Sequence, residues 1–350
     1  MNRVVLPKGL VRVFPRKTNA TPDDEAAYVG RGPDLWTEAE RVHVSVAFEW
    51  DRQAAEQLAQ QWRCVTSDVT IGGPAYGDAG GDFTPGLYIK RGYTITSRGC
   101  PNACWFCHAW RREGRQIRTL PIAPGWNVLD NNLLACPRPH VEAVFEMLKG
   151  QPDRPRFTGG FEAALLEPWH VEHLVELRPK VMWFAYDTPD DLEPLIAAAR
   201  LLADAGLISA AHAACCYVLC GWKGDTFDDA EQRMWRVVGL GLFPQAMLFN
   251  RGRHFDEGER KPWVRFAREW SNKIIVGVKM REGGGVGENE TLPIKCPREE
   301  LEKMGFVFGE MADDLFVKVK MPVVRSELVG RGSLVHLYAQ RETQRNGITT

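Results

Sequence analysis

The chain has almost no net charge. Its 44 lysine and arginine residues are offset by 45 aspartate and glutamate residues, which leaves a formal net charge of -1 over 350 residues. A protein that binds a polyanion over a broad surface needs an excess of basic residues. The composition therefore gives no indication of such a surface and leaves room only for a local basic patch.

Long apolar runs are also missing. Residues 1–10 contain no apolar segment of the kind found in a secretory signal. The most apolar stretch, residues 195–222, is interrupted by Arg200, Asp204 and His212, which argues against a membrane span. Nine cysteines with no evident disulfide framework suit a reducing compartment. We therefore expect a cytoplasmic protein without membrane association; its oligomeric state is left open.

One cysteine motif carries the strongest chemical signal. The run Cys100-Pro101-Asn102-Ala103-Cys104-Trp105-Phe106-Cys107 has the spacing C-x3-C-x2-C and follows a predicted strand at residues 93–97. Three thiolates in one short loop can hold three corners of a [4Fe-4S] cluster, because soft sulfur ligands suit iron–sulfur centres. The fourth iron would then be open to a small molecule that receives an electron.

Zinc is the main alternative for this motif. Structural zinc sites usually close four ligands drawn from two paired knuckles, and the chain has no second C-x2-C. His108 directly follows Cys107, so it would be a cramped fourth ligand for one tetrahedral ion. The sequence therefore favours a cluster over zinc. Two other cysteines, Cys215 and Cys216, point to opposite faces of a predicted strand and are interpreted as core thiols.

The cysteine motif and the segments around it, residues 90–250, resemble the radical S-adenosylmethionine (SAM) superfamily. The run Thr96-Ser97-Arg98-Gly99-Cys100-Pro101 looks most like the branches that carry a cobalamin-binding domain and the methylthiotransferases. The further amino-terminal cluster cysteines of methylthiotransferases have no counterpart here. The resemblance implies that Cys100, Cys104 and Cys107 hold a [4Fe-4S] cluster whose fourth iron chelates SAM, and that Phe106 packs against the SAM adenine.

Strands and helices alternate after the motif. Predicted strands at 93–97, 127–130, 156–158, 181–186, 214–220 and 245–249 are separated by predicted helices at 139–149, 169–177, 191–205 and 227–238. Short β-rich runs divided by helical periods indicate an α/β fold with a parallel sheet and right-handed crossovers. Six such units are similar to the partial (βα)6 barrel of the superfamily.

Ligand sites in parallel α/β folds lie at the carboxyl ends of the strands. Gly159, Gly160 and Glu162 follow the third predicted strand and are similar to the "GGE" element that binds the SAM amino group. Phe161 separates the glycines from the acid, so either backbone carbonyls or Glu162 would make that contact. A plain glycine turn after a buried strand is the alternative.

Two further strand ends match the resemblance. Asp187 stands where the family often places a polar residue against the SAM ribose, and a cap of the next helix is its alternative role. Gly221 closes an apolar strand end, Val218-Leu219-Cys220-Gly221, that resembles the one beside the adenine. Tyr186, Cys216 and Cys220 are candidates for lining the barrel.

The domain organisation follows from these patterns. We expect an amino-terminal extension at 1–40, a small Rossmann-like βαβ fragment at 41–90, the partial barrel at 91–270 and an α+β appendage at 271–350 that begins with a short strand at 274–278. The fragment resembles a degenerate cobalamin-binding domain, because the D-x-H-x-x-G motif that supplies a cobalt ligand is absent. Bound cobalamin is therefore not favoured. In the appendage, the glycine-rich residues 282–288 are interpreted as a hinge or lid.

The resemblance implies a reaction class but no substrate. A reduced cluster would donate an electron to SAM, and the resulting 5'-deoxyadenosyl radical would abstract hydrogen from a small molecule, a peptide or a nucleic-acid base. A flavodoxin or ferredoxin would be the reductant. Two alternatives stay open: a cobalamin-dependent radical SAM methylase, and a non-catalytic iron–sulfur sensor or partner-binding protein.

Overall fold

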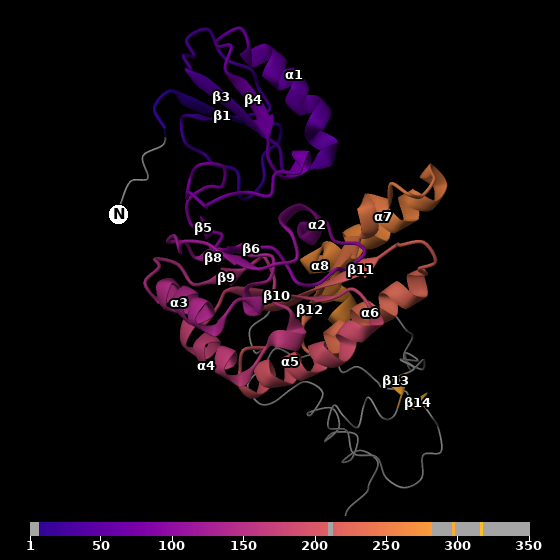
Figure 1. Ribbon diagram of the computed structural model, residues 1–350. Coiled ribbons are helices and arrows are strands. Elements are labelled where there is room, and N and C mark those ends of the chain that lie inside the picture. Colours follow the sequence, from indigo (N-terminus) through magenta and orange to yellow (C-terminus); the bar gives the residue numbers. More distant parts are fainter. Residues whose placement is uncertain (1–6, 209–212, 282–295, 298–315, 318–350) are drawn as a thin grey trace, which may run out of the picture. The chain divides into compact units, whose positions relative to one another are not determined.

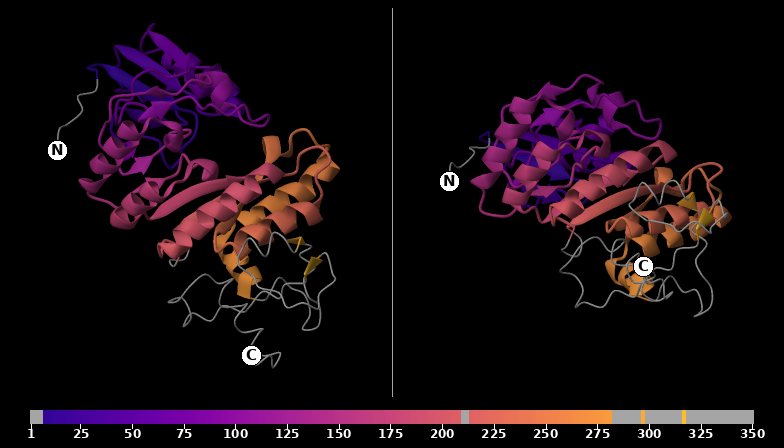
Figure 2. Two further views of the ribbon diagram at one scale, coloured as in Figure 1. Left: turned by 60° about the horizontal axis from the view of Figure 1, so that its bottom comes forward. Right: turned by 90° about the horizontal axis from the view of Figure 1, so that it is seen from below.

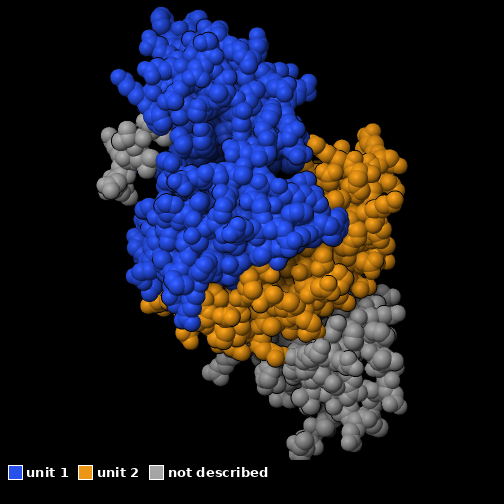
Figure 3. Space-filling view, in the orientation of Figure 1, with its two compact units in different colours: residues 1–160 blue, residues 161–350 orange. Residues whose placement is uncertain are grey.

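The computed structural model describes residues 7–208, 213–281, 296–297 and 316–317. The chain divides into two compact units, residues 1–160 and 161–350 (Figure 3). The predicted hinge or lid at 282–288 lies outside the described residues. The two units are described separately.

The first unit begins with a four-stranded parallel sheet in the order β2-β1-β3-β4. Figure 1 labels β1, β3 and β4 of this sheet and the helix α1 beside it. Its elements are β1 (Leu10–Phe14), β2 (Ala27–Val29), β3 (Arg41–Ser45), α1 (Arg52–Trp62) and β4 (Val69–Gly72). Valines alternate along β1 and β3, so one face of the sheet is apolar and packs against α1. The buried core is made of Val11, Val13, Val42, Val44, Val46, Ala55, Leu58, Ala59, Trp62 and Ala75.

This sheet contains more than the predicted βαβ fragment. The strand–helix–strand unit expected within 41–90 is present as β3, α1 and β4, but β1 and β2 come from residues that the sequence analysis placed in an extension. The physical reason is the run Leu10–Phe14, in which every residue is buried. Such an apolar run is not stable in solvent. It is buried as a strand that pairs with β3.

The rest of the first unit holds short strands and two helices. Parallel strands β5 (Tyr93–Thr94), β8 (Asn127–Val128) and β9 (Arg156–Phe157) are neighbours in that order. The pair β6 (Ser97–Arg98) and β7 (Arg118–Thr119) is antiparallel and encloses the segment that contains α2 (Ala109–Glu113). Helix α3 (Arg138–Lys149) follows a short 3-10 turn, Leu133–Ala135, and precedes β9.

The second unit repeats the strand–helix alternation. Its elements are α4 (Pro168–Leu177), β10 (Val181–Tyr186), α5 (Leu192–Asp204), β11 (Ala214–Cys220), α6 (Phe227–Gly239), β12 (Phe243–Leu248), α7 (Glu257–Ser271) and α8 (Lys273–Arg281). Strands β10, β11 and β12 are parallel neighbours in continuous register. Figure 2 shows α5 and α6 lying along the strands, as crossover helices do. A two-stranded antiparallel pair, β13 (Cys296–Pro297) and β14 (Phe316–Val317), completes the described elements.

The structure confirms an α/β fold with parallel sheets. Each of the six predicted strands is present, three in each unit, although the first is split into β5 and β6. The predicted strand at 274–278 is wrong, because these residues form α8. Asn272 explains the helix: its side-chain Oδ1 accepts hydrogen bonds from the backbone N–H groups of Ile274 and Ile275 at 2.9 and 3.3 Å. Within the described part of the chain, no helix is both long and apolar enough to cross a bilayer.

Candidate functional site

The three motif cysteines lie in the loop that joins β6 to α2. Cys100, Cys104 and Cys107 are each partly exposed. The backbone N–H of Cys107 donates to the Cys104 carbonyl at 3.1 Å, which makes a tight turn between the last two cysteines. Phe106 is half-buried and meets the exposed Trp105 edge to face at 5.4 Å.

The residues that follow the loop hold its backbone. The Trp110 indole Nε1 donates to the Cys104 carbonyl at 2.9 Å, and Arg111 donates to the Trp105 carbonyl at 2.8 Å. Gly99 precedes the first cysteine with a φ of +89°, and a Cβ at this position would lie 2.3 Å from the Gln116 carbonyl oxygen. Only glycine fits that approach and that dihedral angle. The loop is therefore shaped by its own sequence and by α2.

Glu113, at the end of α2, is a buried carboxylate that joins the two ends of this segment. Its side chain accepts hydrogen bonds from the Gly99 backbone N–H at 3.2 Å and from Arg112 at 2.6 Å. It also accepts one from the Asn131 amide, and Arg98 lies 3.6 Å away. A buried carboxylate is stable only with such partners.

Two N–H groups reach cysteine sulfurs. The Asn132 side-chain amide lies 3.8 Å from Cys100 Sγ, and the Ala109 backbone N–H lies 3.4 Å from Cys107 Sγ. Such donors stabilise a thiolate, which is the form that binds iron. The loop therefore offers partly exposed sulfurs with hydrogen-bond support, and this donor set fits the predicted cluster.

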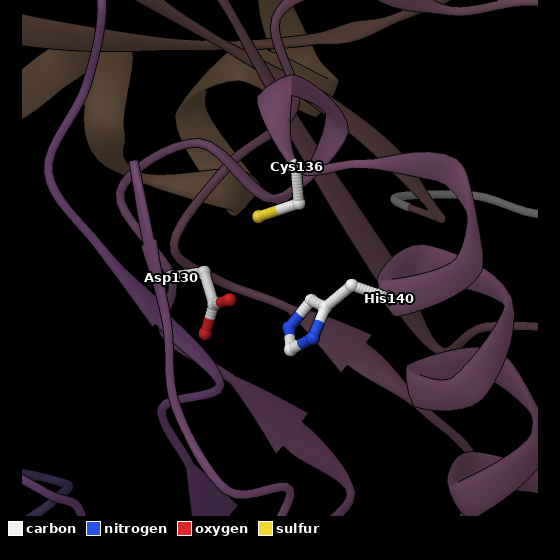
Figure 4. A group of neighbouring side chains, drawn as sticks. All are labelled: Asp130, Cys136 and His140. Atoms are coloured by element: carbon white, nitrogen blue, oxygen red, sulfur yellow. The ribbon is translucent and has the colours of Figure 1, made fainter. Parts of the chain in front are cut away.

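A second group of donors lies beside the segment that leads into the loop. Asp130, Cys136 and His140 bring a carboxylate oxygen, a thiol sulfur and an imidazole nitrogen within 4.8 Å of one another (Figure 4). The Asp130 carboxylate accepts hydrogen bonds from the backbone and hydroxyl of Thr96 at 2.7 and 2.6 Å, and from the Ser97 hydroxyl at 2.6 Å. These are the residues just before the cysteine loop.

The predicted SAM glycines follow β9. Gly159 donates to the Val128 carbonyl at 3.0 Å, and a Cβ there would lie 2.2 Å from the Asp130 carbonyl oxygen. The close approach of neighbouring backbone thus explains why residue 159 is glycine. Gly160 has a φ of +100°, which requires glycine on conformational grounds. Glu162 is half-buried and comes directly before a 3-10 turn, Ala163–Leu165.

Asp187 follows β10 and does not cap the next helix. Thr188 caps the 3-10 turn Pro189–Asp191, and Asp191 is the N-cap residue of α5. The Asp191 carboxylate accepts the backbone N–H groups of Asp187 and Thr188 at 2.9 and 2.7 Å. The Asp187 side chain instead accepts the Leu219 N–H of β11 at 3.1 Å. Burial, and then the nearby Asp191 charge, raise the pKa of Asp187 to about 7.

Gly221 follows β11 with a φ of +69°, and its N–H donates to the buried Asp225 carboxylate at 2.7 Å. Asp225 in turn pairs with Arg233 of α6 at 2.8 Å. The turn after β11 is therefore fixed by an ion pair that the sequence analysis did not anticipate.

Tyr186, Cys216 and Cys220 were expected to line the barrel, and this expectation is wrong. In the register of β10 and β11 they share one face of the sheet, and each is at most 1% exposed. The Tyr186 hydroxyl bonds Arg236 of α6 at 2.9 Å, so this face is the one that α6 covers. Burial of Cys215 and Cys216, by contrast, confirms their interpretation as core thiols.

The chain matches no protein-family model and no curated protein. The assignment of function therefore rests on the residues themselves. Sequence reasoning missed Glu113, Asp130 and His140 as parts of the site. Asp130 had a detectable signal, because it ends a predicted parallel strand, and acids at such ends are candidates for function.

Proposed function

We propose that this protein is a radical SAM enzyme with the active site of that superfamily. Cys100, Cys104 and Cys107 would hold a [4Fe-4S] cluster. When bound, the cluster would supply the electron that splits SAM reductively into methionine and a 5'-deoxyadenosyl radical. The substrate would be a small molecule, a peptide or a nucleic-acid base, and a flavodoxin or ferredoxin in the cytoplasm would be the reductant.

The observation that carries the proposal is the cysteine loop. Its three sulfurs come from one loop between β6 and α2, and N–H groups of Asn132 and Ala109 are directed at two of them. A structural zinc site would need a fourth ligand. His108, which directly follows Cys107, was the candidate for that ligand, and it is exposed at the start of α2. The donor set thus suits a three-cysteine cluster better than zinc.

The chain's own residues would bind and orient SAM. We propose that the six parallel strands belong to one partial (βα)6 barrel whose strand ends carry the SAM contacts. Phe106 would pack on the adenine near Gly221, Asp187 would accept the ribose hydroxyls, and Gly159, Gly160 and Glu162 would hold the amino group. Burying SAM among these residues would exclude water from the radical.

The pKa of Asp187 matters for its proposed role. A carboxyl group with a pKa of about 7 is neutral in a large fraction of molecules at physiological pH. Two ribose hydroxyls that donate to the carboxylate would stabilise its charged form, so SAM binding would lower this pKa. SAM affinity should therefore rise as the pH is raised from 6 to 8.

The test is anaerobic reconstitution of the full chain with iron and sulfide, followed by reduction, addition of SAM and chromatography for 5'-deoxyadenosine. We expect deoxyadenosine from the wild type and from Cys64→Ser, a control at an exposed thiol outside the loop. Cys104→Ala should form none. A cluster that binds SAM without cleavage would favour the sensor alternative, corrinoid retained on purification would favour the methylase, and failure to form any cluster would refute the proposal.

A further inference from the structure

Three side chains with different donor atoms converge in the first unit, outside the cysteine loop. Asp130 follows β8, Cys136 ends the short turn before α3, and His140 lies in the first turn of α3 (Figure 4). Asp130 and Cys136 are 1% and 7% exposed, while His140 is partly exposed. The 3-10 turn Leu133–Ala135 reverses the chain, and this reversal brings the start of α3 back to the end of β8.

Two of the three side chains in this group are acids, and the third is an imidazole. The Asp130 carboxylate forms no ion pair with a lysine or arginine of the described chain, and His140 is the one basic group that acts on it. Burial lowers the pKa of His140, which keeps the imidazole neutral. Burial also raises the pKa of Asp130 and raises the pKa of the Cys136 thiol to about 11. Two buried acidic groups and a partly exposed imidazole therefore lie together.

We propose that Asp130, Cys136 and His140 bind one divalent transition-metal ion, with Zn²⁺ as the best match. A thiolate, a carboxylate and a neutral imidazole carry two negative charges, which a dication neutralises. Sulfur and nitrogen donors favour Zn²⁺ over Mg²⁺ or Ca²⁺, which prefer oxygen ligands. On binding, the thiol and any protonated carboxyl group release their protons to solvent.

The carboxylate has capacity for a metal in addition to its hydrogen bonds. A carboxylate offers about four lone pairs, and three of them accept hydrogen bonds from Thr96 and Ser97. These donors would orient the carboxylate, as the outer hydrogen-bond partners of metal ligands commonly do. The Ser97 hydroxyl lies beside both Asp130 and Cys136. It or a water molecule would complete a four-coordinate shell.

His140 would change its partner when the metal binds. Its Nε2 lies 3.2 Å from the Thr96 hydroxyl oxygen, and that hydroxyl already donates to Asp130 at 2.6 Å. Nε2 would exchange this contact for the metal. The ion would then connect α3 to the segment 96–97 that leads into the cysteine loop, so its role would be to hold that segment in place.

The experiment isolates this site from the loop. In the full chain carrying Cys100→Ser, Cys104→Ser and Cys107→Ser, Co²⁺ is titrated anaerobically while the thiolate-to-cobalt charge-transfer absorption is recorded, and Zn²⁺ is then added as competitor. We expect one Co²⁺ per chain with a charge-transfer band, displacement by Zn²⁺, and a higher midpoint of thermal unfolding with Zn²⁺.

Two further substitutions in this parent decide the outcome. Cys136→Ser should abolish the charge-transfer band, and His140→Gln should weaken Co²⁺ binding more than about tenfold. Cys64→Ser, at an exposed thiol, should change neither. If Cys136→Ser does not fold, His140→Gln alone decides, because this side chain is partly exposed. A parent that binds no Co²⁺, or affinity unchanged by both substitutions, would overturn the proposal. Because the loop cysteines are absent from this parent, the result does not depend on the proposed radical chemistry.

Discussion

Single residues decide whether the cysteine loop keeps its shape, and Glu113 is the most connected of them. Its buried carboxylate joins Gly99, before the first cysteine, to Arg112 and Asn131. We predict that Glu113→Ala lowers the free energy of unfolding by about 3 kcal/mol, because it leaves one buried backbone donor and two partly buried side-chain donors without their acceptor. Iron bound per chain after reconstitution should fall as well.

Chemical denaturation and iron analysis check this prediction against a matched glutamate. Glu142 pairs with Arg138 one helical turn away in α3, and both side chains are substantially exposed. Glu142→Ala should therefore cost about 0.5 kcal/mol or less and leave the iron content unchanged. Equal effects of the two substitutions would show that Glu113 has no special role in the loop.

Some of these residues could be identified from the sequence, and others could not. The three cysteines could be identified because their pattern is local, within eight positions. Glu113 and Asp130 could not be assigned to the same region, because their roles depend on contacts that reach up to 34 positions along the chain. Gly159 was interpreted as a ligand-binding position, and the structure adds a packing reason for it in the approach of the Asp130 carbonyl.

At the scale of elements, strands and helices with strong local signals were predicted well. Residues 181–186 and 214–220 form β10 and β11 with the predicted bounds. The first predicted strand, 93–97, is broken because the Thr96 backbone N–H donates to the Asp130 carboxylate instead of to a neighbouring strand. In α8, β-branched residues suggested a strand, but the cap supplied by Asn272 and the packing of the segment favour a helix.

Asp187 links the end of β10 to β11 and makes the stability of the second unit depend on pH. Its pKa is about 7 in the folded protein and about 3.9 in an unfolded chain. Between these values the folded state binds more protons, so the stabilising contribution is complete below pH 4 and is lost as the pH rises to 7. Asp187→Asn stays neutral and keeps an acceptor for the Leu219 N–H. We therefore predict that this variant gains stability relative to the wild type, by about 1–3 kcal/mol at pH 8.

Denaturant unfolding of both proteins at intervals from pH 4 to 8 measures this difference. It should be small at pH 4, grow up to pH 7 and then level off. Asp204→Asn, at an exposed carboxylate at the end of α5, is the control and should not reproduce the curve. A difference that is independent of pH would mean that Asp187 is charged throughout this range in the folded protein.

At the scale of the whole molecule, residues 10–14 and 27–29 form strands of a folded sheet. A buried arginine of this sheet binds residues 86–87. Arg12 lies in β1 and is completely buried. Its guanidinium donates to the carbonyls of Gly86 and Leu87 at 2.7 and 2.9 Å and pairs with Asp24. This contact was not predictable, because an isolated arginine in an apolar run resembles an interruption of a strand. Residues 86–87 are thus fixed to the sheet.

Replacement of Arg12 should release that segment. Arg12→Met keeps most of the side-chain volume but leaves the buried Gly86 carbonyl and the partly buried Leu87 carbonyl without this donor. We therefore predict a loss of about 3 kcal/mol in the free energy of unfolding. Trypsin should then cleave faster after Lys90 and Arg91, which directly follow the held segment. Arg63→Met, at an exposed site beyond α1, is the matched control and should change neither stability nor cleavage. Arg12→Met could instead lower stability without faster cleavage near residue 90. That result would mean that the arginine supports only the sheet. Residues 86–90 would then be held by other contacts, such as the hydrogen bond from the Lys90 N–H to the Ala20 carbonyl.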